Sequence, residues 1–282
     1  MSTNADHEDP IANFHVSRIP YNEDTIVKII NETYHLYQQL NYIATWELIW
    51  PPEGGHVINQ ALCEELHLDP AVISLMKRLP YIRWSQLASD IPFMRFSRPF
   101  VYLEDDEIRG GRDPDRFQVD EPRIDFLLPH EIALTCSTDE GSSAIMDLKE
   151  NTIRVWDFND GPPGDDPDNY RAYPPFHAPT FLSTHLEKIR SLEIIPSGTR
   201  NVRDLWDKHY EEEYLKIKRT LQEQFGWPYD FREEEWKAVA KVTWERIIRD
   251  EPDFELDPDD SDLPPGMEED PDFNGPFPQT PR

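Results

Sequence analysis

The sequence predicts an α+β protein, with a mostly antiparallel sheet of about four to six strands flanked by helices. Three observations predict this class. Residues 22–40 place apolar side chains at helical spacing. Residues 143–158, SAIMDLKENTIRVWDF, have the pattern of a complete β-hairpin. Residues 202–248 carry two further apolar stripes at helical spacing, which predict a helical hairpin after the sheet.

The composition limits the kinds of partner that the protein can bind. The chain has 282 residues, of which 56 are acidic and 28 basic, and its formal net charge is −28. This charge repels the phosphates of nucleic acids and of anionic membranes, so we expect a protein partner and favour a basic one. The chain has two cysteines, no run of about 20 apolar residues and no signal-peptide pattern at its start. We therefore expect a location in the cytoplasm or the nucleus.

The first predicted elements are helices. A helix is predicted over 22–40, with Asn22 as its N-cap. The segment 42–56 is apolar but interrupted by prolines and glycines, which predicts an extended, turning path. Two short helices are predicted over 59–66 and 69–79, because each begins with an Asn or Asp that can cap free backbone amides.

Strands are predicted next, at 100–103, at 131–136 and in the two arms of the hairpin. Between the first two, residues 104–116, EDDEIRGGRDPDR, predict a charged turn. Residues 149–152 form the turn of the hairpin, where Asn151 tolerates the left-handed backbone that such a turn often needs.

The remainder is predicted to be helical and then disordered. A loop rich in Pro, Asp and Gly over 159–179 leads to a helix over 180–192. The helical hairpin pairs 202–225 with 230–248, separated by Gly-Trp-Pro. Residues 251–282 are dominated by acidic residues and proline, and they predict a disordered acidic tail.

These elements divide the chain into four parts. We predict a flexible N-terminus over 1–20, an α+β domain over 21–196, a helical hairpin extension over 197–250 and the acidic tail over 251–282.

Few residues could carry chemistry. His130-Glu131 begins a zinc motif, but Leu134 replaces the second histidine and the segment has a strand pattern. Cys136 could act as a nucleophile with His130 and a nearby carboxylate, although a buried strand cysteine is the commoner role. We therefore assign no catalytic residue, no metal site and no cofactor.

Two groups of side chains are candidates for binding a partner. Arg109, Arg112 and Arg116 are concentrated in one loop, where they could receive an anion. We favour the alternative that Arg112 and Asp113 stabilise the loop locally. Trp46 and Trp50 could form a recognition surface, since tryptophan is enriched at binding hot spots, but we favour a role in core packing.

A third candidate lies on the second strand of the hairpin. Arg154, Trp156 and Phe158 share one face of that strand, because alternate residues of a strand point the same way. This face is either part of the core or a binding patch. We favour the core, because a large aromatic side chain offers much area to bury.

Several motifs resemble the SUKH superfamily, which includes the yeast glucan-synthesis regulatory protein and many bacterial toxin-immunity proteins. They are Asp147-Leu148, Val155-Trp156-Asp157 and Phe181-Leu182. The segments INQALCEELHLDPAVISLMKRLPY, RGGRDPD and FGWPYDFREEEW are similar to an uncharacterised fungal group with this domain. The resemblance covers roughly residues 40–250 and makes 21–196 a SUKH-like domain. It implies a protein-binding scaffold and supplies no catalytic residues.

Two functions from different classes follow. The first is a non-catalytic protein-interaction or regulatory module with an acidic surface. The second is a small hydrolase or transferase that uses Cys136 and His130. A structure distinguishes them, because a buried Cys136 sulfur far from every imidazole would remove the second. The sequence does not give the oligomeric state.

Overall fold

The fold is α+β, as the sequence predicts. The computed structural model describes residues 19–83, 97–114, 126–137, 141–157, 170–199, 202–209 and 211–249. The helices are α1 Glu23–Gln39, α2 Gln60–Glu65, α3 Pro70–Arg78, α4 Asp105–Gly110, α5 Ala178–Arg190, α6 Glu211–Arg219 and α7 Glu233–Arg249. The strands are β1 Leu48–Ile49, β2 Tyr81–Ile82, β3 Ser97–Pro99, β4 Glu131–Ala133, β5 Thr135–Ser137, β6 Ser142–Asp147, β7 Thr152–Asp157, β8 Phe176–His177, β9 Ile195–Thr199 and β10 Val202–Trp206.

The central sheet has four antiparallel strands in the order β4-β6-β7-β8. The predicted hairpin forms its middle pair, and Asn151 adopts a φ of 55° in the turn, as expected. Ile132, Met146 and Ile153 are partners across the sheet and form one apolar row. They are fully buried, which is expected for a sheet face covered by helices. The prediction of a mostly antiparallel sheet is therefore confirmed.

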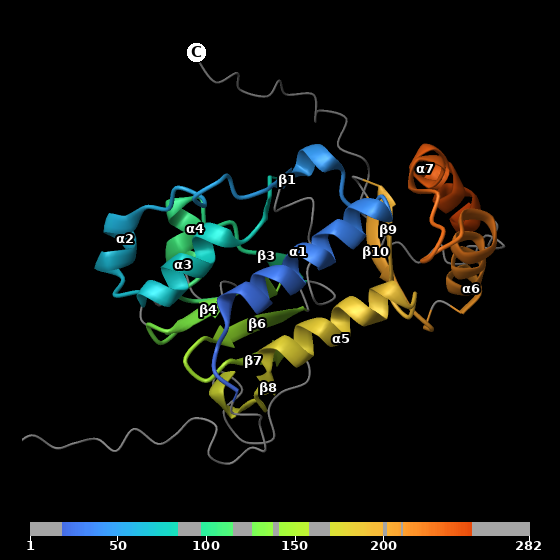
Figure 1. Cartoon of the computed structure of the whole chain (residues 1–282). Helices are drawn as coiled ribbons and strands as arrows, with labels where there is room; N and C mark the ends of the chain where they lie inside the picture. Colours follow the sequence, from blue (N-terminus) through green and yellow to red (C-terminus); the bar gives the residue numbers. More distant parts are fainter. Residues whose placement is uncertain are drawn as a thin grey trace, which may run out of the picture.

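Two long helices cover the sheet and lie side by side (Figure 1). They are α1 and α5, which share the core through apolar side chains and through a hydrogen bond of 3.0 Å between Tyr37 and His185. The pair α6 and α7 lies at one end of this layer, and α2, α3 and α4 lie at the other end (Figure 1). No helix of the described residues is long and apolar enough to cross a membrane.

The N-terminal helices begin where the sequence predicts. The Asn22 side chain accepts a hydrogen bond from the Thr25 amide at 2.9 Å, and Asn59 accepts one from the Leu62 amide at 3.2 Å. Asp69 accepts from the Ala71 amide at 2.9 Å. Each cap satisfies a backbone N–H that a helix leaves without a partner, so local chemistry alone sets these boundaries.

Three predictions around the first strands differ from the structure. Residues 100–103 do not form a strand, because the pairing begins earlier, at β3, which lies antiparallel to β5. The predicted charged turn contains α4, whose first turn carries three acidic residues that favour a helix N-terminus. The predicted strand 131–136 is divided at Leu134 into β4, which pairs with β6, and β5, which pairs with β3.

The start of the predicted helical hairpin is also wrong. Val202–Trp206 is strand β10, and it pairs with β9 over five residues. The helical hairpin itself consists of α6 and α7, so it begins at Glu211. The predicted boundary between residues 196 and 197 falls inside β9. The predicted flexible N-terminus, apart from residues 19 and 20, and the predicted tail over 251–282 lie outside the described residues.

Candidate functional site

The turn between α6 and α7 is attached to the end of α5, and α7 itself is attached to the end of α1. The Trp227 indole N–H donates to the Arg190 carbonyl at 2.8 Å, and the Trp236 indole N–H donates to the Leu40 carbonyl at 3.0 Å. These carbonyls belong to the last residue of α5 and to the C-cap residue of α1, where the backbone carbonyls of a helix have no partners within the helix. The two tryptophans therefore hold the α6–α7 pair against α1 and α5.

A groove of about 590 Å³ lies at this junction. We call it the junction groove. Its walls come from α1, from α5, from the segment after α6 and from the turn before α7. The lining residues are Leu36, Gln39, Glu187, Arg190, Ser191, Gln222, Trp227, Pro228, Tyr229 and Phe231. A second depression of about 570 Å³ follows α5 toward its N-terminus, and Glu187 and Ser191 line both depressions.

Tyr229 is the most exposed large side chain of the junction groove. It is 99% exposed, on a turn whose backbone is held by a 2.9 Å hydrogen bond from the Asp230 amide to the Gly226 carbonyl. Beneath it, the Trp227 and Phe231 rings pack edge to face, with centroids 4.8 Å apart. Trp227 is buried, so the turn presents an exposed aromatic ring on a rigid base.

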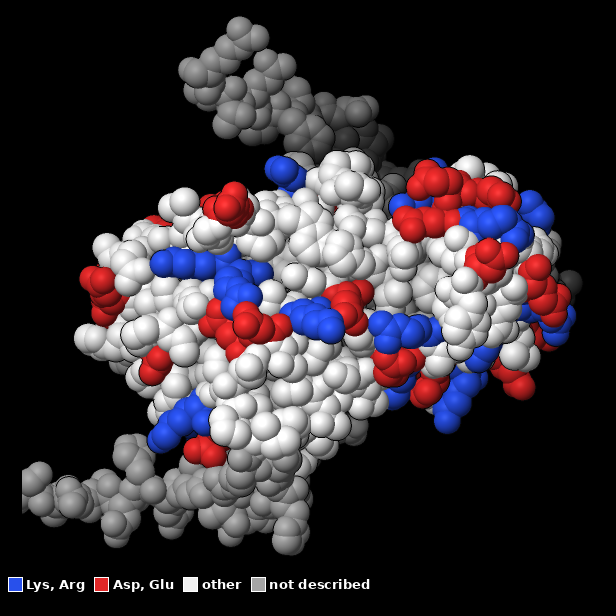
Figure 2. Space-filling view, in the orientation of Figure 1, with Lys and Arg blue, Asp and Glu red and all other residues white. Residues whose placement is uncertain are grey.

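The charged side chains of the junction groove are already paired. Arg190 bonds to Glu32 at 3.4 Å and also to Glu187. Lys28 continues this line of charges through its own pair with Glu32, and Figure 2 shows basic and acidic side chains alternating across this face. Within the described residues the side-chain amides of Gln39 and Gln222 make no hydrogen bond. The groove therefore offers amide groups and aromatic surface, with its charges balanced.

The predicted tryptophan pair is only partly exposed. Trp46 is 52% exposed, on a 3-10 turn after α1. Trp50 is half-buried, packs against the core and stacks on His35, with centroids 4.5 Å apart. The structure gives the two residues different surroundings, with Trp50 in the packing role that we favoured.

The predicted arginine loop does not form an anion receptor in the described residues. Arg112 is buried and donates to the carbonyls of Leu127, Leu128 and Glu131. Arg109 pairs with Glu65 at 3.1 Å, which ties α4 to α2. Arg116 lies outside the described residues. Arg112 thus stabilises the loop locally, as we favoured.

The predicted binding face of β7 is buried. Trp156 is 8% exposed and packs near the rings of Phe126 and Tyr170, with centroids 5.7 and 6.3 Å away. Arg154 is 2% exposed and donates to the Tyr173 carbonyl at 3.2 Å. Burial lowers the pKa of Arg154. Phe158 lies outside the described residues. Arg154 and Trp156 are therefore core residues and not a surface patch.

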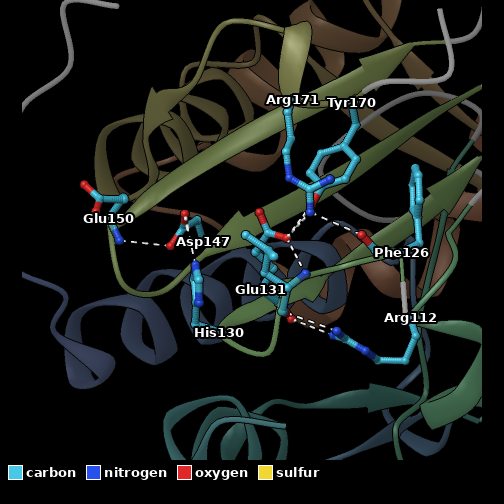
Figure 3. Close-up of polar contacts among 9 residues, drawn as sticks. Arg112, Phe126, His130, Glu131, Asp147, Glu150, Tyr170 and Arg171 are labelled. Carbon is cyan, nitrogen blue, oxygen red and sulfur yellow. Dashed lines mark hydrogen bonds and ion pairs between the residues drawn. The ribbon is translucent and has the colours of Figure 1, made fainter. Parts of the chain in front are cut away.

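A buried polar network lies on the face of the sheet that carries Arg154 and Trp156 (Figure 3). The apolar row described above lies on the opposite face. The Glu131 carboxylate accepts hydrogen bonds from the Tyr170 hydroxyl, from Arg171 at 3.3 Å and from the Leu128 amide at 2.7 Å. Burial raises the pKa of Tyr170. Arg171 also donates to the Phe126 carbonyl at 3.2 Å. These bonds attach two irregular segments to the sheet, which is a structural role.

The next buried carboxylate of this face is Asp147. It accepts a bond from the Glu150 amide at 2.9 Å, and its other oxygen lies 3.7 Å from His130 (Figure 3). Burial raises the pKa of Asp147 above its ordinary value. No group of three His, Cys, Asp or Glu side chains among the described residues is placed to hold a metal ion.

The structure does not bring Cys136 and His130 together. The Leu148 amide donates to the His130 carbonyl at 3.0 Å, while the Ser137 amide next to Cys136 donates to the Ser143 hydroxyl at 3.1 Å. These contacts place the two residues at opposite ends of β6, about 16 Å apart at about 3.3 Å per residue. Cys136 is also buried. The arrangement expected of a cysteine hydrolase or transferase is therefore not formed by this pair.

The acidic charge is unevenly distributed. The described residues include 30 acidic and 22 basic side chains, a net charge of −8 against −28 for the whole chain. Residues 251–282 alone carry 11 acidic side chains and one basic side chain. The predicted acidic surface thus belongs mainly to segments outside the described residues.

Comparisons with protein-family models, with curated proteins and with solved structures find no match for this chain. The resemblance to the SUKH superfamily therefore stays a prediction from the motifs.

Sequence reasoning missed the junction groove. Its lining comes from three stretches that are far apart in the chain, so no local pattern marks it. One signal was available. Tyr229 follows Gly226-Trp227-Pro228, a stop signal between two helices, and a turn there exposes the next side chain.

Proposed function

We propose that the protein is a non-catalytic interaction module that binds an extended segment of a partner protein in the junction groove. The observation that carries this proposal is Tyr229, a fully exposed aromatic ring at the edge of a groove whose floor is aromatic and aliphatic. Ligand grooves typically combine such apolar walls with a few polar groups that fix orientation, here Gln39 and Gln222.

Tyrosine suits this position energetically. Its ring supplies a large contact area but has few rotatable bonds, so ordering it on binding costs little conformational entropy. The backbone beneath it is already held by Trp227 and by the bond between Asp230 and Gly226. Tyrosine, tryptophan and arginine are also the residues most enriched at hot spots.

The proposed partner is a protein, in agreement with the charge of the chain and with the SUKH resemblance. A basic partner would gain further attraction from the acidic residues of 251–282. We propose that the module acts in the cytoplasm or the nucleus, where two free, buried cysteines such as Cys63 and Cys136 are stable.

Affinity capture from the native cell tests the proposal with a pair of matched variants. Tyr229→Ala removes the exposed ring, and loss of a hot spot of at least about 2 kcal/mol weakens partner binding about 30-fold. Val57→Ala is the control, because Val57 is 92% exposed and precedes α2 in the chain, and α2 lies at the opposite end of the molecule from α6 and α7 (Figure 1). Quantitative mass spectrometry should find proteins that Tyr229→Ala loses and Val57→Ala retains. Identical captured sets would refute the proposal.

A further inference from the structure

The junction groove has the features of a site for a proline-rich, uncharged segment. Grooves that bind proline-rich chains are lined by aromatic rings, and they exploit the low entropy of the polyproline II conformation. Here Trp227, Tyr229 and Phe231 supply the rings. The two charges of the lining, on Arg190 and Glu187, are bonded to each other, so a charged peptide gains little there.

One stretch of the chain itself matches this chemistry. All 11 acidic residues of 251–282 precede Phe273, and residues 273–281, FNGPFPQTP, carry no charge. Residues 276–281, PFPQTP, contain three prolines, two of them three positions apart, which is the PxxP pattern. We call residues 276–281 the proline segment.

We propose that the proline segment binds in the junction groove of its own chain and competes there with the partner protein. The inference rests on the proposed function, because it assigns a regulator to the same site. In this arrangement the prolines and Phe277 pack on the aromatic wall around Tyr229. Gln39 and Gln222 donate hydrogen bonds to the exposed carbonyls of the segment, which a polyproline II chain leaves free.

The chain between the last described residue and the proline segment has a suitable length. Helix α7 begins beside the turn that bears Tyr229 and has 17 residues, so its far end at Arg249 lies about 25 Å away at about 1.5 Å per residue. Residues 250–275 then precede the proline segment. At most about 3.3 Å per residue, these 26 residues reach up to about 86 Å, which is enough to bridge 25 Å.

Intrachain disulfide trapping tests the inference on the full chain. We choose Ser191→Cys with Gln279→Cys, because Ser191 lines the groove and the pair keeps Tyr229, both groove glutamines and every proline of the segment intact. The control pairs Val57→Cys with Gln279→Cys. Native Cys63 and Cys136 are buried and do not compete. Under mild oxidation at low protein concentration, the groove pair should form an intrachain disulfide at least about tenfold faster than the control pair.

A second variant separates specific binding from chance encounter. Adding Phe277→Ala and Pro278→Ala to the groove pair should reduce its rate to that of the control pair. Phe277→Ala alone should increase capture of the partner protein, because the competitor is weakened. Equal rates for the groove and control pairs would overturn the inference, and so would disulfides formed only between chains. Either result leaves the Tyr229 capture experiment unaffected, so failure of the regulator is distinguishable from failure of the proposed function.

Discussion

Replacement of Trp156 by alanine tests whether the aromatic face of β7 is core. A tryptophan buries on the order of 200 Å² of surface, and Trp156 is 8% exposed, so nearly all of this area is lost from the core. At about 25 cal/mol per Å² the loss is about 5 kcal/mol, an upper value because the unfolded chain already buries part of that area. We expect Trp156→Ala to lower the free energy of unfolding by about 3 to 5 kcal/mol.

Urea unfolding measures this loss, with Tyr229→Ala as the control. The exposed Tyr229 should change the unfolding free energy by no more than about 0.5 kcal/mol. The Trp156→Ala curve should move to a lower midpoint with an unchanged slope. Overlapping curves for Trp156→Ala and Tyr229→Ala would refute the reasoning and return the Arg154 and Trp156 face to the list of partner surfaces.

The other predictions concern buried groups and turns. Burial lowers the pKa of His185 from 6.5 to about 4, and the charge of Lys188 adds to this effect. Between pH 6.5 and about 4, His185 is therefore protonated in the unfolded chain and neutral in the folded chain. The free energy of unfolding should therefore fall by about 2 to 3 kcal/mol between pH 6.5 and 4.5, and His185→Gln should remove that share of the measured pH dependence. Gly226→Ala should cost about 1 to 3 kcal/mol in urea unfolding, because its φ is 79° and an added Cβ would meet the Asp230 carbonyl. Gly54→Ala is the matched control, with a φ of 94° and open space, and a loss as large as that of Gly226→Ala would contradict this reasoning.

The elements that the sequence predicts correctly are those with local causes. The caps at Asn22, Asn59 and Asp69 each need a side chain and an amide two or three residues apart, and all three occur in the structure. The hairpin is local too, since its strands are joined by a four-residue turn that includes Asn151.

The elements that the sequence misses depend on contacts between distant residues. Val202, Leu205 and Trp206 have a spacing that fits a helix as well as a strand, and pairing with β9 decides for the strand. Leu134 separates β4, which pairs with β6, from β5, which pairs with β3. Such choices are made by tertiary structure, which a local pattern does not contain.

The binding candidates show the same division. Arg112 and Arg154 look like surface residues by type, but both donate hydrogen bonds to carbonyls of irregular segments inside the fold. The junction groove forms only when α1, α5 and the turn at Tyr229 meet, so its residues have no common sequence pattern.

Photo-cross-linking at position 229 tests the central claim most directly. A photoreactive phenylalanine derivative replaces Tyr229 and keeps an aromatic ring at the groove, and the same group at Val57 is the control. After irradiation in native-cell extract, mass spectrometry identifies the attached proteins and the attached peptides. We predict that position 229 repeatedly attaches to one extended segment of a small set of proteins, and that position 57 does not. The same adducts at both positions, or none at position 229, would contradict the account.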